Sequence, residues 1–161
     1  MARFETKIKE GAAPFLEEGE EVLAAVVARP RGWTQATAAG GGAVTAGRVG
    51  AAIGGRTQQR NVDAAHQAGF EIASPMALAV THRRLLSLDI GSPIGLGIGG
   101  KVKELVSVVP LSAVDSIAVK RLLVGKTVTV TVRGTPFMLE VGAGANAGGV
   151  VEAFERAKAV A

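Results

Sequence analysis

Cysteine and tyrosine are absent from this chain, and large aromatic side chains are few. Its 161 residues include five phenylalanines and one tryptophan. Without cysteine, disulfide bonds, thiolate nucleophiles and cysteine-ligated metals are excluded. The absence is also compatible with a reducing compartment, so we expect a cytoplasmic protein.

Long apolar segments are missing as well. No run of 18 residues is free of charge, which argues against a conventional membrane-spanning helix. The segment Met1–Glu10 is charged throughout and lacks the apolar stretch of a secretory signal. Association with a membrane surface remains open.

Small and β-branched apolar residues are plentiful instead. Hydrophobic residues make up 48% of the chain, and alanine, valine and glycine dominate its text. A core built from such thin side chains favours strands over helices.

Charge is unevenly distributed around the net value of +4. Residues 1–21 contain six acidic and three basic side chains, whereas residues 22–133 contain thirteen basic and five acidic ones. A basic body behind an acidic N-terminal segment could attract anionic lipid, nucleic acid or an acidic protein. A merely solvated surface explains the same counts.

Alternating apolar residues predict a mainly β, antiparallel fold with seven strands. The clearest alternation is the Thr/Val text at 127–132. Residues 2–18 have apolar side chains at helical spacing, and Asn146 is a suitable cap for an amphipathic helix over 147–159. The predicted strands are Val22–Ala28, Met76–Thr81, Leu85–Ile90, Glu104–Pro110, Val114–Lys120, Thr127–Arg133 and Pro136–Val141.

Residues 33–60 are rich in glycine and alanine and allow three interpretations. Gly42, Ala46, Gly50 and Gly54 recur every four residues, so in a helix they form one small face that lets another helix approach closely. Glycine disfavours helix, which supports a flexible linker instead. Insertion into a membrane is the third interpretation, and Arg48 argues against it.

Four stretches resemble bacterial pleckstrin-homology-like (PH-like) proteins. They are EEGEEVLAAV at 17–26, LAVTHRRLLSLD at 78–89, VVPLSAVDSIAV at 108–119 and GTPFMLEV before the last helix. The resemblance implies a seven-strand PH-like barrel capped by the C-terminal helix. It divides the chain into an N-terminal helix (1–16), a β domain (17–32 and 74–161) and a Gly/Ala-rich insertion (33–73). Such a scaffold binds lipid head groups, peptides or further copies of itself, and it does not imply an enzyme.

Reaction chemistry is poorly represented. Gly95–Gly100 fits a phosphate-binding glycine pattern, but a strand pattern follows where a helix is required. His66 and His82 have neither cysteine nor paired carboxylates nearby in the sequence, and His82 is expected in a solvent-facing turn. We therefore predict no catalytic residue, cofactor, metal or small-molecule substrate.

Basic residues near strand ends are the better binding candidates. If the barrel gathers them at one rim, they form a patch for phosphate or carboxylate groups. Arg84 could instead turn inward and pair with Asp115 or Asp89. Nucleic acid is disfavoured, since only Trp33 and Phe137 could stack on bases. The candidates are Arg83, Arg84, Lys101, Lys103, Lys120, Arg121 and Lys126.

Two functions are therefore expected from different classes. The preferred one is protein–protein interaction or homo-oligomer assembly, through the β domain and the small-residue face. The alternative is peripheral binding to anionic membrane through the basic rim and the insertion.

Overall fold

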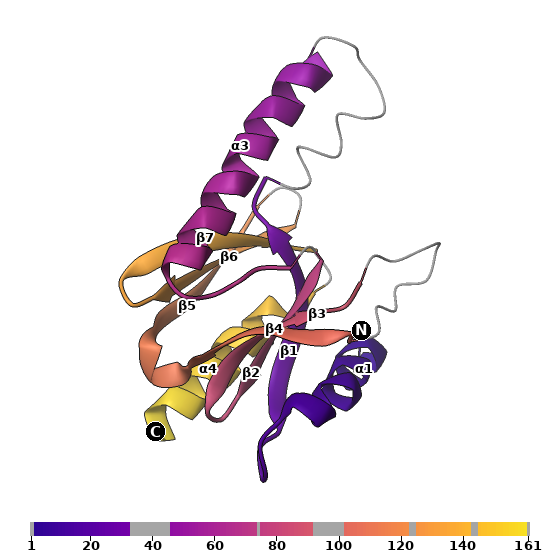
Figure 1. Ribbon diagram of the computed structural model, residues 1–161, viewed down its shortest axis with the longest axis vertical. Coiled ribbons are helices and arrows are strands. Elements are labelled where there is room, and N and C mark those ends of the chain that lie inside the picture. Colours follow the sequence, from indigo (N-terminus) through magenta and orange to yellow (C-terminus); the bar gives the residue numbers. More distant parts are fainter. Residues whose placement is uncertain are drawn as a thin grey trace.

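A computed structural model describes residues 2–32, 46–73, 75–91, 102–122, 125–142 and 145–160 (Figure 1). Its core is one seven-stranded antiparallel sheet with the order β4-β3-β2-β1-β7-β6-β5. The strands are β1 (Val22–Pro30), β2 (Met76–Thr81), β3 (Arg84–Asp89), β4 (Glu104–Pro110), β5 (Val114–Arg121), β6 (Lys126–Val132) and β7 (Thr135–Val141). The predicted number of strands, their succession along the chain and their antiparallel pairing are thus confirmed.

The sheet is open between its two edge strands. Strands β4 and β5 are the ends of the hydrogen-bonded order, and the 3-10 turn η3 (Leu111–Ala113) joins them along the chain. The predicted barrel is therefore a bent open sheet, whose two halves meet where β1 pairs with β7 over three residue pairs.

The inner face of the sheet is covered by the C-terminal helix α4 (Ala147–Val160). Val150, Phe154 and Ala157 of α4 are buried with Leu78 and Val130 of the sheet in the larger hydrophobic cluster. Asn146 caps α4 as predicted, because its Oδ1 accepts a hydrogen bond of 3.0 Å from the Gly149 amide.

The outer face of β1–β3 carries the N-terminal helix α1 (Ala2–Ala12). Ile8 and Ala12 of α1 are buried against Ala25, Ala77 and Ala79, whose small side chains leave room for the helix. Both faces of these strands are thus covered, which explains why every residue of β2 is buried. The helix is shorter than the predicted 2–18, because a 3-10 turn, η1 (Ala13–Phe15), with Pro14 in its first positions, replaces it.

A third helix, α3 (Ala46–Gln67), lies between β1 and β2 in the chain. Residues 46–60 are helical, so the linker interpretation of 33–60 is wrong there, while the packing of another helix on their small side chains stays a prediction. Ala46, Gly50 and Gly54 lie in α3, whereas Gly42, like all of 33–45, lies outside the described residues. Figure 1 shows α3 leaning on β7 at one end and projecting from the sheet at the other.

Tertiary contacts hold the end of α3 that touches the sheet. Phe70 stacks on Phe137 of β7 with 5.5 Å between ring centroids. Asn61 Oδ1 accepts a hydrogen bond of 2.8 Å from the Met138 amide, and Arg133 donates one of 3.0 Å to the Ala68 carbonyl at the end of the helix. None of the described helices is both long enough and apolar enough to cross a bilayer.

Candidate binding site

Three of the sequence stretches that carry the PH-like resemblance meet at the turn between β2 and β3. The Thr81 hydroxyl oxygen accepts hydrogen bonds from the amides of Arg83 (3.1 Å) and Arg84 (2.9 Å), which shapes the turn. The Leu111 amide of η3 donates to the Arg83 carbonyl at 3.0 Å. The third stretch, at 17–26, provides Glu20, whose carboxylate is hydrogen-bonded to Thr81 of the turn.

Glu20 is the buried anchor of this region. Arg84 donates two hydrogen bonds to it, from Nε at 2.9 Å and from Nη2 at 2.5 Å. Thr81 Oγ1 donates a third at 2.7 Å, and the Glu17 amide donates a fourth at 2.9 Å. The Glu20 side chain is 0% exposed and that of Arg84 16%.

The hydrogen bonds from Arg84 lower the pKa of Glu20 to about 2, although burial alone would raise it. The same pair raises the pKa of Arg84. Arg84 thus turns inward, which was one of the two alternatives predicted for it. Its partner is Glu20, so the predicted partners Asp115 and Asp89 are wrong. Asp115 accepts a hydrogen bond from the Gly134 amide, and Asp89 accepts one from the Gly91 amide.

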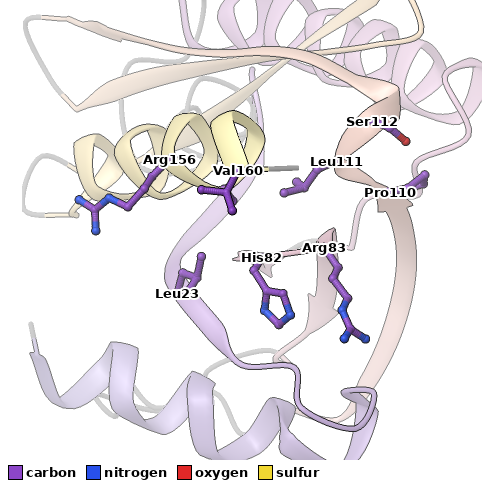
Figure 2. Close-up of a pocket in the computed structure, with 9 residues that line it drawn as sticks. Leu23, His82, Arg83, Pro110, Leu111, Ser112, Arg156 and Val160 are labelled. Carbon is purple, nitrogen blue, oxygen red and sulfur yellow. The ribbon is translucent and has the colours of Figure 1, made fainter.

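Next to this turn an open pocket of about 600 Å³ lies beneath the end of α4 (Figure 2). We refer to it as the α4 pocket. Its apolar part comes from β1, β4, η3 and α4, and its polar part comes from the β2–β3 turn, η3 and α4. The lining residues are Leu23, His82, Arg83, Pro110, Leu111, Ser112, Arg156, Ala157 and Val160.

Positive charge lies on two sides of the pocket. In Figure 2, Arg156 and Arg83 lie on opposite sides, with Leu23, His82 and Val160 between them. None of the nine lining residues is acidic. Val160 is 86% exposed, so an apolar side chain stands uncovered at the mouth. The arrangement suits an apolar group that carries negative charge.

His82 and Ser112 both line the α4 pocket, yet no hydrogen bond joins them in the part of the chain that the structure describes. The same part of the chain contains no cluster of three or more His, Asp or Glu side chains that could hold a metal. What the pocket offers is shape, apolar surface and cationic groups.

The predicted basic residues divide between the two ends of the sheet. Pairing aligns Asp89, Met76, Ala28, Val141, Lys126 and Arg121 in one row across the strands. Lys103, Lys120, Arg121 and Lys126 belong to that end. Arg83 and Arg84 lie at the other end, roughly 17 Å away along the six residues of β3. Lys101 lies outside the described residues.

Only part of the α4 pocket was predictable from the sequence. Arg83 is among the predicted binding residues, whereas Arg156 is not. His82 is half-buried in the pocket rather than simply facing solvent. Phe137 is buried and stacked on Phe70, so it cannot stack on a base, and Trp33 lies outside the described residues.

Comparison with known proteins finds similarity in structure only. No protein-family model matches this chain, and no curated protein does. A DUF1696 family protein with a pleckstrin-homology domain from Shewanella loihica PV-4 is 12% identical, with a TM-score of 0.45 over 94% of this chain and 93% of that one. A pleckstrin homology domain from Shewanella amazonensis SB2B is 15% identical, with a TM-score of 0.46 over 94% of this chain and 85% of that one. Both names include a pleckstrin-homology domain, which is said of those two proteins.

Proposed function

We propose that this chain is a non-enzymatic interaction module, which holds a segment of another protein, or of a second copy of itself, in the α4 pocket. The observation that supports the proposal is the pocket itself, an open apolar surface between two arginines that make no contact with each other. Apolar anchors surrounded by polar groups are typical of protein–protein contacts.

Val160 offers a direct test, because it is exposed at the pocket and ends a helix. We would pan a displayed library of random octapeptides on the immobilised full chain and on the Val160→Asp variant. The matched control is Val108→Asp, the same change at an exposed valine of β4 outside the pocket. We expect the wild type and the control to enrich peptides that Val160→Asp retains at least about tenfold less well. Enrichment that is absent, or equal on all three proteins, would contradict the proposal.

Solution mass separates the two kinds of partner. Light scattering over a range of concentrations should give a multiple of the 16.3 kDa chain if the partner is a second copy. A further contact between copies is proposed at the small-residue face of α3, with Ala46, Gly50 and Gly54. Val160→Asp would reduce the mass to that of one chain if the pocket holds the second copy, whereas Gly50→Leu would do so if the copies pack through α3. If the wild type is strictly monomeric, the partner that binds the pocket is a different protein.

Peripheral binding to anionic membrane is a second candidate, favoured by one observation. Lys103, Lys120, Arg121 and Lys126 share the end of the sheet opposite the α4 pocket. Lysines and arginines near a surface contribute about 1 kcal/mol each to binding anionic lipid. Lys126 is partly engaged, since its Nζ donates to the Ala145 carbonyl at 3.0 Å.

Vesicle co-sedimentation tests this second candidate. Vesicles of phosphatidylcholine alone would be compared with vesicles that also contain phosphatidylserine, at low and moderate salt. We expect binding only to the charged vesicles, weakened by salt and by the Lys120→Glu/Arg121→Glu double variant. Binding that depends on neither lipid charge nor these residues would exclude the candidate.

A further inference from the structure

We infer that the α4 pocket takes an acidic segment of another protein with an apolar side chain at its centre, and that Glu17 occupies the partner's place on Arg83 in the free chain. This inference rests on the proposed function, and it specifies the chemistry of the partner and an internal competitor for it.

Charge complementarity carries the first step. The pocket presents His82, Arg83 and Arg156 and no acidic lining residue. Arg156 is exposed and forms no hydrogen bond or ion pair with another described residue. Because apolar side chains separate the two arginines, the complementary segment places a carboxylate on each side of an apolar residue.

The second step comes from the contrast between the two neighbouring arginines. Arg84 is held by the buried Glu20 carboxylate and is not available to a ligand. Arg83 meets Glu17 at 3.4 Å between Nη1 and Oε2, with the side chains 49% and 59% exposed. An ion pair this long and this exposed is weak, so an incoming carboxylate replaces Glu17 with little loss.

Glu17 can be altered without disturbing the turn behind the pocket. The bond that Glu17 gives to Glu20 comes from its backbone amide, which a side-chain substitution leaves in place. Its side chain lies 4.0 Å from Arg84 Nη1, but Arg84 keeps its two bonds to Glu20 without it. Glu17→Gln therefore removes the charge opposite Arg83 and is expected to retain the fold.

The neighbouring Glu18 provides the matched control. It is exposed, carries the same charge and forms no ion pair within the described residues. Glu18→Gln changes the net charge equally but leaves Arg83 paired. A gain in binding that is confined to Glu17→Gln cannot result from misfolding or from overall charge.

The test measures fluorescence anisotropy with a labelled octapeptide of alternating leucine and glutamate, and with a version that has glutamine for glutamate. We expect only the acidic peptide to bind the wild type. Glu17→Gln should lower its Kd by about threefold to fivefold and Glu18→Gln by much less. Arg83→Gln should raise the Kd by about tenfold and remove the benefit of Glu17→Gln in the double variant, because the two residues act through one contact.

Each contrary result overturns a defined statement. If peptides bind through the α4 pocket but the neutral version binds equally well, the inference fails and the proposed function stands. Equal effects of Glu17→Gln and Glu18→Gln would refute the competitor role of Glu17. If no peptide shows Val160-dependent binding, the proposed function itself fails, and phosphatidylserine vesicles that bind in a Val160-dependent manner would replace the protein partner by lipid.

Discussion

Glu20 shows how one buried carboxylate can organise a turn that is distant in the sequence. Removing a charge from water is costly unless hydrogen bonds replace the lost solvent. Here Arg84, Thr81 and the Glu17 amide satisfy both carboxylate oxygens. The Glu20 carboxylate therefore stabilises the fold only when it is ionised, so the stability of the fold is sensitive to acid.

The pH dependence follows from the lowered pKa of Glu20. Its pKa falls from 4.5 to about 2 on folding, so between these values the unfolded chain binds more protons than the native one. The stabilisation is complete above about pH 5 and is lost as the pH falls toward 2. Between about pH 5 and pH 3, the free energy of unfolding of the wild type should fall by about 2 kcal/mol more than that of Glu20→Gln.

Urea titrations at the two pH values would measure this difference. Glu18→Gln serves as the control. Because Glu18 is exposed, we expect this variant to show the same pH dependence of stability as the wild type. An equal fall for the wild type and Glu20→Gln would show that Glu20 does not contribute.

The partner of Arg84 was not predictable from local sequence. Thr81 and Arg84 are recognisable as a motif, and an inward Arg84 is a reasonable expectation. Glu20 lies 64 residues earlier in the chain, and only the pairing of Val22 with Thr81 brings the two together. Local patterns favour nearby carboxylates such as Asp89, which lies at the far end of the same strand.

At the scale of elements, the hairpin between β6 and β7 depends on two residues with left-handed backbone. Arg133 has a φ of 49° and Gly134 one of 81°, a conformation that suits the twist of a two-residue hairpin. Nothing lies within 4 Å of a Cβ added at Gly134, so the cost of a side chain there is conformational and not steric.

Two alanine substitutions should therefore have opposite effects. Gly134→Ala should lower the free energy of unfolding by about 1–2 kcal/mol. Gly148→Ala, at an equally open position in the first turn of α4, should raise it by about 0.5 kcal/mol because alanine favours helix. Denaturant unfolding of both variants would show this, and the same sign for both would contradict it.

Strands were more predictable than the helix in the insertion. Apolar runs bounded by turn residues place β2 to β7 within a residue or two, and alternation marks strands with one covered face, such as β6. Helix α3 has no such signal over its glycine-rich part. Its sheet-facing end is held by Phe70, Asn61 and Arg133 through contacts with β7 and the end of the helix, and such contacts are visible only in the folded chain.

At the scale of the whole molecule, α4 connects the two halves of the open sheet. It contacts β1 and β2 on one side and β5 on the other, and Phe154 is 3% exposed in the shared core. Whether the predicted basic residues share one rim could not be predicted from the sequence. The answer depends on the strand register, which decides at which end of the sheet each residue lies.

Phe154→Ala tests this connection. Truncation of a buried phenylalanine costs about 3–5 kcal/mol, and here the loss should reach both halves. We expect hydrogen exchange to accelerate in β1, β2 and β5 together, whereas Glu155→Ala on the exposed face of α4 should leave it unchanged. Faster exchange in only one half would show that α4 does not couple them.

The pairing of β1 with β7 has a consequence for the order of folding. Strands β1 to β4 are consecutive neighbours, so they can pair while the chain is still being synthesised. The second partner of β1 is the last strand, and α4 follows it. The apolar inner face therefore stays uncovered until α4 has been synthesised, and closing the long loop between β1 and β7 is expected to be a slow kinetic step.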